Sequence, residues 1–319
     1  MAFYTDKWTL VQKNREDLWL FRKSKNNLLM EDLANGGEVP ERRILKSDIL
    51  EEYDIAIRDK TSIYLLYQNT AGYLVLVTVD EDIREETILT DKAISEVFNL
   101  TIGLEDGAIH IIYNIRSMED PDKYTINHHF NLGGKWYDYI ISEVGAKLIN
   151  SMKFLVQEGR AILLYYRNDR EIVYREFHRD RLEWGGEELL AGGEGEKLFL
   201  DGIIIRGEIH FTYCQYLEES LLVKYGDQSI SRPGSPAHPT MIYYRGKLWV
   251  SWLEMDQVAS RYSEDMGKTW AKLHMWKRTK TMDFVRYKYL TLESGEDMNF
   301  DYSYGSIYPE IKFIGFGST

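Results

Sequence analysis

Short apolar runs that end in an aromatic residue recur along the chain, and each run follows a polar turn. Residues 109–113, for example, read Ile-His-Ile-Ile-Tyr and come directly after Asp106-Gly107 and Ala108. The six runs of this kind begin at Leu18, Ile63, Ile109, Ala161, Ile209 and Leu248. Successive starts lie 45, 46, 52, 48 and 39 residues apart, so the pattern indicates six repeats with a period near 46 residues.

Each repeat has the same internal order of strands. An apolar strand such as residues 241–244 leads into a two-residue turn, here Arg245-Gly246, and a second, strongly apolar strand follows. A third strand alternates, as in residues 73–79, and a shorter fourth segment often carries a tryptophan. Four short antiparallel strands in 40 to 50 residues are typical of β-propeller blades. Helical periodicity is scarce, and residues 92–98 are the only short candidate for a helix.

The repeats predict an all-β fold, a six-bladed β-propeller of four-stranded antiparallel blades in a single domain, residues 1–319. The predicted blades cover approximately residues 8–50, 51–95, 96–145, 146–195, 196–236 and 237–319. An open ring would leave a blade edge unpaired. Residues 308–315 resemble the first strand of a blade, and we expect this C-terminal strand to close the ring. A seventh, degenerate blade across residues 281–319 is the alternative.

One octapeptide has a distinctive spacing of turn-forming residues. Residues 263–270 read Ser-Glu-Asp-Met-Gly-Lys-Thr-Trp, in which the side chains of Ser263 and Asp265 suit a tight turn, Gly267 permits a positive φ, and Trp270 after Thr269 supplies an apolar anchor. This segment resembles the Asp-box, or BNR repeat, of the sialidase-like β-propellers. The resemblance implies that the box stabilises the fold and lies away from any reaction centre. A weaker copy keeps the same offsets at Asn131, Gly133 and Trp136.

Composition excludes several kinds of partner and site. The formal net charge of −12 disfavours nucleic acid and anionic membranes, because phosphate binding needs a basic face. The single cysteine, Cys214, excludes an intrachain disulfide, and its place in an alternating apolar run favours an inert strand residue. The histidines lack metal-ligand spacing, so we expect no metal and no cofactor. No signal peptide or membrane-spanning run is visible, which leaves the cytoplasm or a phage-like or exported particle as the expected location. The oligomeric state is not predicted.

The candidate site follows from where the first strand of each repeat begins, because propellers place their sites on loops at one mouth of the central channel. We expect Asp54, Asp201 and Glu310 to supply catalytic carboxylates, if the protein is an enzyme, since glycoside hydrolysis uses a pair of them. The predicted ligand-binding residues are Asn99, Lys153, His238 and Tyr308.

The chain departs from the sialidases at the positions that carry their chemistry. The resemblance implies an early Arg-Ile-Pro motif and three arginines, but the nearest string is Arg42-Arg43-Ile44, and the other arginines are scattered, several of them in hairpin turns. We therefore assign no sialidase activity. The sequence predicts a propeller that binds a carbohydrate or protein ligand at one mouth. The alternatives are a glycoside hydrolase that uses the channel-mouth carboxylates and a tyrosine, and an adhesive subunit of a larger particle.

Overall fold

The computed structural model describes residues 7–14, 17–33, 42–80, 83–145, 152–292, 297–308 and 310–317. Throughout these residues the chain is built from β-strands, and the one helix among them is a single 3₁₀ turn, η1 (Lys277–Lys280). The all-β prediction is therefore confirmed. The helix considered for residues 92–98 is wrong, because residues 92–96 are irregular and β9 (Val97–Glu105) begins at Val97. None of the described helical segments is long or apolar enough to cross a bilayer.

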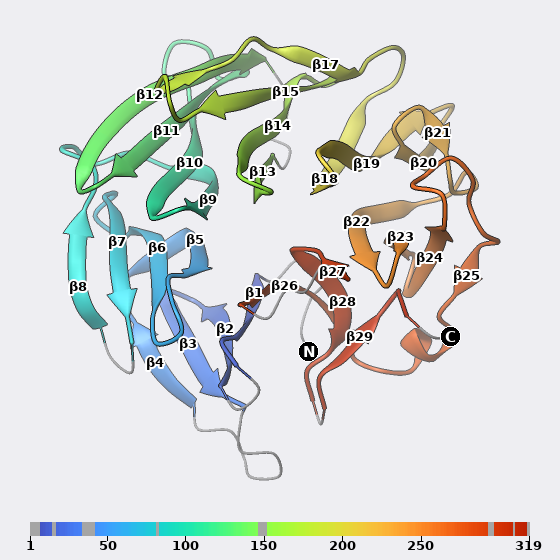
Figure 1. Ribbon diagram of the computed structural model, residues 1–319, viewed down its shortest axis with the longest axis horizontal. Helices are drawn as coiled ribbons and strands as arrows, with labels where there is room; N and C mark the ends of the chain where they lie inside the picture. Colours follow the sequence, from blue (N-terminus) through green and yellow to red (C-terminus); the bar gives the residue numbers. More distant parts are fainter. Residues whose placement is uncertain are drawn as a thin grey trace. The chain divides into compact units, whose positions relative to one another are not determined.

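The chain divides into two compact units, and unit 2 contains residues 6–143 and 288–293. Its first sheet has the order β26-β1-β2-β3-β4. These strands are β26 (Val285–Thr291), β1 (Trp8–Gln12), β2 (Leu18–Ser24), β3 (Asn27–Asp32) and β4 (Arg42–Lys46). The second sheet contains β5 (Ile49–Ile57), β6 (Ile63–Asn69), β7 (Leu74–Val79) and β8 (Ile83–Ile88), drawn side by side in Figure 1. The third contains β9, β10 (Ala108–Arg116), β11 (Lys123–Leu132) and β12 (Lys135–Gly145).

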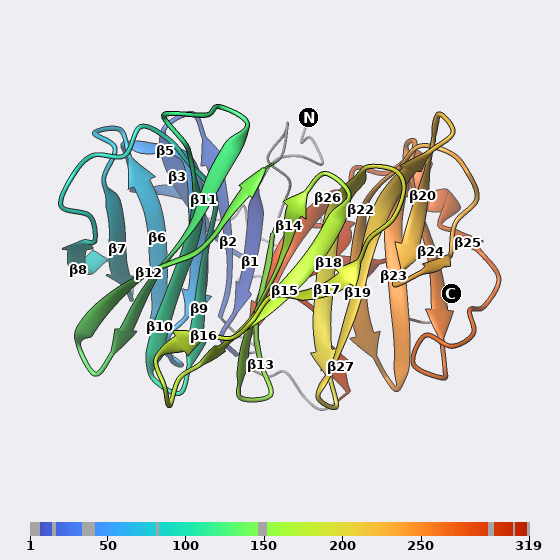
Figure 2. The same ribbon diagram turned by 90° about the horizontal axis from the view of Figure 1, so that it is seen from above.

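Unit 1 contains residues 1–5, 144–287 and 294–319. Its first sheet is formed by β13 (Lys153–Gln157), β14 (Arg160–Asn168), β15 (Glu171–His178), β16 (Glu183–Trp184) and β17 (Glu188–Ala191). The next is formed by β18 (Lys197–Ile205), β19 (Glu208–Leu217), β20 (Ser220–Tyr225) and β21 (Gln228–Ser229). The last contains β22 (Pro236–Tyr244), β23 (Lys247–Glu254), β24 (Gln257–Ser263), β25 (His274–Met275) and β27 (Met298–Asn299). Figure 2 shows β22, β23 and β24 of this sheet from above.

Four of the hairpins that join first and second strands have the same two-residue turn. Asp106, Glu158, Arg206 and Arg245 have φ between 44° and 53°, and each is followed by a glycine with φ between 69° and 80°. Two successive positive φ values are typical of a type I′ turn, whose twist matches that of the strands. The second position is where glycine is required, so the X-Gly pairs in the sequence mark these hairpins.

The core lies between successive sheets within each unit. In unit 2, Phe21 and Leu65 belong to a cluster between the first two sheets. In unit 1, Ile162 and Ile204 pack together, and Ile203 packs with Val250 on the next sheet. The sheets of β6 and β19, which pack against a neighbouring sheet on each side, are therefore apolar on both faces, and this explains the continuous apolar runs of these two strands.

The C-terminal strand does not pair directly with the first strand. In the strand order β1 is followed by β26, whereas β29 (Lys312–Ile314) pairs with β28 (Tyr302–Ser306). β29 therefore belongs to the same sheet as β1 without pairing with β1 itself, and closure of the ring by residues 308–315 stays a prediction. A physical reason why β26 and not β29 pairs with β1 is that β26 has seven residues and buries Val285, Tyr287 and Tyr289 on one face, while β29 has only three residues.

The described residues form six sheets, and none of these sheets closes on itself. This arrangement is consistent with a β-propeller. The strands after residue 281 join the first sheet or the sheet of β22 and form no separate seventh sheet among the described residues. The six-bladed ring and the single domain stay predictions.

Candidate functional site

Three charged side chains meet in unit 1, from β13, from β18 and from the residue before β28. The ammonium group of Lys153 lies 2.9 Å from Oδ1 of Asp201 and 2.7 Å from Oδ2 of Asp301. Lys153 and Asp201 are almost completely buried. Burial disfavours the charged form of Lys153, but the two carboxylates outweigh it and raise its pKa. Two of the predicted site residues, Lys153 and Asp201, are thus brought together as an ion pair.

The second carboxylate oxygen of Asp201 accepts a hydrogen bond from the backbone N–H of Met241 at 2.9 Å. Asp201 on β18 therefore connects to β13 on one side and to β22 on the other. Since both of its oxygens have protein partners and the side chain is buried, the contacts are those of a structural link between strands.

Asp54 has the same kind of surroundings in unit 2. Lys288 donates to both oxygens of Asp54, at 2.7 and 2.8 Å, and the backbone N–H of Ile102 donates to Oδ2 at 3.0 Å. Asp54 on β5 thus connects β26 with β9. Asp54 belongs to unit 2, whereas Asp201 and Glu310 belong to unit 1. Their shared catalytic role stays a prediction.

Asn99 and His238 lie at irregularities of the first strands. Their φ values are 54° and 49°, and the register of β9 and of β22 shifts close to them. Phe199 occupies the corresponding place on β18 with a φ of 59°. Left-handed residues in such bulges redirect the strand, and for a bulky residue they carry strain. Burial and the charge of Arg286 lower the pKa of His238 to about 4, so its imidazole is neutral at pH 7.

Tyr308 and Glu310 lie near the end of the chain and are exposed. The carboxylate of Glu310 pairs with Lys312 at 2.8 Å, and this contact lowers its pKa. The geometry brings neither residue into the group of Lys153, Asp201 and Asp301. The catalytic role of Glu310 and the ligand-binding role of Tyr308 stay predictions.

The octapeptide that follows β24 is held by its own side chains. Oγ of Ser263 accepts the N–H of Gly267 at 2.7 Å, and Oδ1 of Asp265 accepts the N–H of Thr269 at 2.8 Å. The bonds from Thr269 and Ser263 lower the pKa of Asp265 to about 2. Trp270 packs edge-on against Tyr225, with 5.1 Å between ring centroids.

The weaker copy in unit 2 has a simpler turn. Oδ1 of Asn131 accepts the N–H of Gly134 at 3.1 Å, and Gly133 has a φ of 60°. Trp136 packs against the cluster between the second and third sheets. Both segments are thus tight turns whose tryptophan contacts the core.

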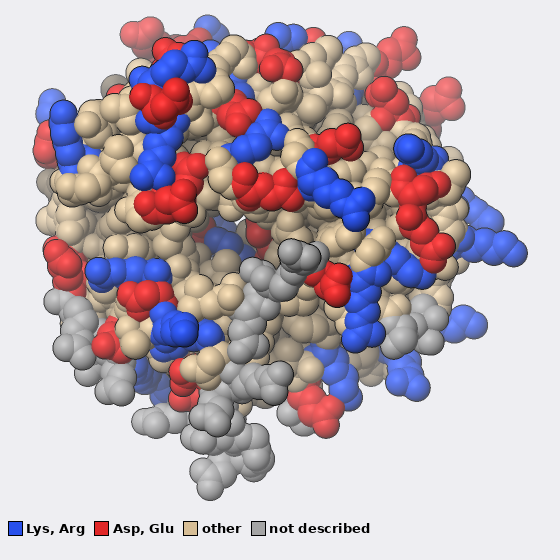
Figure 3. Space-filling model, viewed as in Figure 1, with Lys and Arg blue, Asp and Glu red and all other residues tan. Residues whose placement is uncertain are grey.

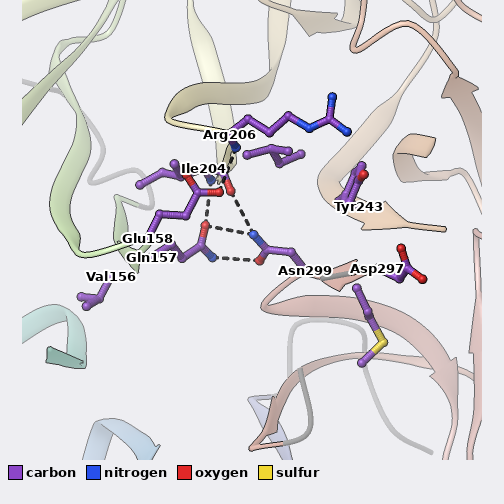
Figure 4. A pocket seen from close by; sticks show the side chains of 10 residues that line it. Val156, Gln157, Glu158, Ile204, Arg206, Tyr243, Asp297 and Asn299 are labelled. Carbon is purple, nitrogen blue, oxygen red and sulfur yellow. Dashed lines mark hydrogen bonds between the residues drawn. The ribbon is translucent and has the colours of Figure 1, made fainter. Parts of the chain in front are cut away.

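Unit 1 has a cavity of about 640 Å³, and Figure 4 shows the residues that line it. The cavity lies beside the turns that follow β13 and β18, whereas Lys153 and Phe199 lie near the beginnings of these strands. Its lining residues are Val156, Gln157, Glu158, Ile204, Ile205, Arg206, Tyr243, Asp297, Met298 and Asn299. The sequence prediction placed the site at the opposite end of these strands and missed this cavity. The X-Gly turns identify Glu158 and Arg206 as hairpin residues, but β27 comes from a distant part of the chain, and its pairing with Tyr243 and Tyr244 has no local signal.

One wall of the cavity is fixed by hydrogen bonds that Figure 4 shows as dashed lines. The carboxylate of Glu158 accepts the backbone N–H groups of Arg206 and Gly207 at 2.8 and 2.6 Å. Asn299 exchanges hydrogen bonds with Gln157 and donates to the carbonyl of Ile204 at 3.0 Å. These bonds connect β13, β18 and β27, so the wall is preformed.

The charged groups around the cavity differ in their pairing. Arg160, near the same hairpins, forms a double hydrogen bond with Glu176 at 2.9 and 2.7 Å. The side chains of Arg206 and Asp297, in contrast, have no ion-pair partner among the described residues. Acidic and basic side chains alternate over the visible face in Figure 3 without a single-sign patch. The cavity therefore offers a polar ligand one cation, one anion, the second N–H of the Gln157 amide and the remaining lone pair of Asn299 Oδ1.

No group of three or more metal-ligating side chains occurs in the part of the chain that the structure describes. The hydrogen-bonded pair His110 and His128, 3.1 Å apart in unit 2, is buried with Glu105 beside it.

Comparison with known proteins places the fold but not the family. No family model matches the chain, and no curated protein matches it. An apocarotenoid oxygenase from Synechocystis is 9% identical, with a TM-score of 0.52 over 85% of this chain and 71% of the oxygenase. A prolyl endopeptidase is 14% identical, with a TM-score of 0.51 over 95% of this chain and 47% of its own. A lectin from Aleuria aurantia, in complex with α-methyl-L-fucoside, has 12% identity and a TM-score of 0.47 over 85% of this chain and 95% of the lectin.

The apocarotenoid oxygenase is a β-propeller protein, which agrees with the antiparallel sheets in each unit. At these identities the likeness concerns the fold alone. No family model and no curated protein connects the chain to the sialidase-like family, so that resemblance stays a prediction.

Proposed function

We propose that this chain is a six-bladed, sialidase-like propeller that binds a carbohydrate in the cavity of unit 1 and does not hydrolyse it. The observation that carries the proposal is the cavity itself, with its volume of about 640 Å³ and its mixed polar and apolar lining. Binding sites for small ligands typically have volumes of about 300–1,000 Å³ and a few fixed polar groups.

The lining suits the alternation of hydroxyl groups and C–H faces in a sugar. The amides of Gln157 and Asn299 and the carboxylate of Asp297 provide donors and acceptors for hydroxyl groups. Val156 and Met298 provide apolar surface beside them. Because Glu158 and Asn299 are already held by backbone groups, binding requires little reorganisation of this wall.

A glycoside hydrolase is the second candidate, and one contact favours it. Asp201 and Asp301 both lie within hydrogen-bonding distance of the Lys153 ammonium, so two carboxylates approach the same group. Glycoside hydrolysis needs such a pair, one as acid and the other as nucleophile or base. The ammonium between them and the burial of Asp201 favour a structural pair, and the binding proposal therefore stands first.

A glycan array and a panel of chromogenic glycosides test the two candidates together. The binding proposal expects a glycan to be retained without turnover, and retention to fall at least tenfold in Asp297→Asn. The matched control is Asp256→Asn, the same change on the exposed β23–β24 turn, which should retain the glycan. Hydrolysis that Asp201→Asn abolishes in a folded protein would establish the enzyme instead. Absence of any retained glycan would contradict the binding proposal.

A further inference from the structure

Arg286, on the part of β26 that belongs to unit 1, is a half-buried cation that forms no ion pair with any described residue. No carboxylate among the described residues lies within 4.0 Å of its guanidinium. The inner-strand lysines differ in this respect, since Lys153 contacts Asp201 and Asp301 directly and Lys288 contacts Asp54. Arginine stays protonated in proteins, so a partly desolvated guanidinium remains positively charged. Binding of an anion from solution is therefore favoured at such a group.

The guanidinium is held in one orientation by two neighbours. Its Nε donates to Oγ1 of Thr240 at 3.0 Å, and the group lies over the ring of Tyr302 at 4.0 Å from the centroid. Thr240 is itself fixed, because its hydroxyl donates to the carbonyl of His238 at 3.1 Å. With Nε used and the plane set by the ring, the two terminal nitrogens remain for a ligand. Parallel N–H groups of this kind match the two oxygens of a carboxylate.

None of the described groups around Arg286 forms a direct ion pair with it. His238 is neutral at pH 7, since burial and the arginine lower its pKa to about 4. The carboxylates of Asp201 and Asp301 are shared with Lys153, and Tyr302 offers only its ring face. His238 also keeps a left-handed backbone, which is more typical of binding sites than of ordinary strands.

We infer that Arg286, oriented by Thr240 and Tyr302, is a binding site for a small planar anion, in particular a carboxylate. The site shares no residue with the cavity that carries the proposed carbohydrate function. It is also distinct from the Lys153 ion pairs, in which the protein supplies both charges.

The test measures anion binding to the full chain by thermal unfolding and by calorimetry at constant ionic strength. The probes are acetate, sulfate and chloride. We expect acetate to bind saturably and to raise Tm by roughly 4 °C at one hundred times its Kd, with chloride much weaker. Sulfate separates a carboxylate site from a general oxyanion site, because its oxygens are tetrahedral. Binding of acetate no tighter than sulfate and chloride would contradict the inference.

Variants assign the effect to Arg286. Arg286→Gln should abolish the acetate-dependent rise, and Arg286→Lys, which keeps the charge but not the two parallel donors, should weaken acetate binding about tenfold. Arg278→Gln, the same change on the exposed 3₁₀ turn η1, should bind acetate normally. Acetate binding that survives in a folded Arg286→Gln protein would overturn the inference. Because this readout involves no glycan, its failure is distinguishable from failure of the carbohydrate proposal.

Discussion

Lys288 donates two hydrogen bonds to Asp54, a residue 234 positions earlier in the sequence. The pair connects β26 with β5 inside unit 2, and Asp54 also accepts the backbone N–H of Ile102 on β9. In unit 1, Lys153 and Asp201 repeat this arrangement with the N–H of Met241. A lysine, an aspartate and a backbone N–H from three innermost strands thus recur once in each unit. In each unit this link joins strands of three different sheets.

The first prediction concerns this link in unit 1. Lys153→Met removes the cation that serves both Asp201 and Asp301 and should lower the free energy of unfolding by about 3–5 kcal/mol, because a buried carboxylate loses its partner. Urea unfolding measures the change. The double variant Lys153→Met/Asp201→Asn should be more stable than the single variant, since the uncompensated charge is gone. A single variant as stable as the wild type would show that the pair carries no structural role.

The second prediction concerns the turn at Gly267. Its φ is 90°, and a Cβ atom there would lie 2.3 Å from the ring of Tyr225. Gly267→Ala should therefore displace that ring and destabilise the protein by about 2–3 kcal/mol. The loss combines the backbone strain of alanine at a positive φ with the steric clash against Tyr225. Gly246→Ala is the matched control, because Gly246 has a φ of 74° with open space around it, and only about 1 kcal/mol is expected there. Equal losses in the two variants would contradict the packing argument.

The third prediction is a loss of stability in mild acid. The folded-state pKa of His238 is about 4, below the usual value of 6.5, so the unfolded chain binds a proton more readily than the folded one. Its contribution is complete above pH 6.5 and is lost as the pH falls toward 4. Between pH 6.5 and 5 the wild type should lose about 1.5 kcal/mol from this group. Burial likewise lowers the pKa of His128, which adds to the loss.

The variant His238→Asn isolates this effect, because asparagine tolerates the left-handed φ of 49° and does not titrate. Unfolding in urea at pH 6.5 and pH 5 should show a smaller pH-dependent loss for this variant than for the wild type. The interval stops at pH 5 so that carboxylate titration contributes little. Identical pH slopes for the two proteins would contradict the prediction.

Local patterns in the sequence predict the local structure well. The X-Gly pairs mark the hairpins, and the apolar runs mark the second strands, because turn geometry and burial depend on nearby residues. The positions of β26 and β27 had no such signal. β26 falls within the predicted last blade, residues 237–319, yet it lies beside β1, and β27 is a two-residue strand that pairs with β22. These pairings depend on contacts between distant segments.

The candidate site shows the same division. Placing Lys153 and Asp201 at corresponding positions of their repeats brought them to one region, which their contact in the structure agrees with. The spacing of the repeats could not predict that Lys153 and Asp201 would neutralise each other in an ion pair. The cavity was missed because two of its polar lining residues, Asp297 and Asn299, come from the segment whose pairing had no local signal.

The last prediction concerns the single cysteine. Cys214 is completely buried on β19, burial raises the pKa of its thiol, and its Sγ lies 3.5 Å from the carbonyl oxygen of Pro236. Because the thiolate is the reactive form and the reagent needs access, the native protein should react with a disulfide reagent such as DTNB only as fast as it opens. In denaturing urea one thiol per chain should react within seconds to minutes. Rapid labelling of the native protein would show that β19 is accessible and would contradict the buried position of this strand.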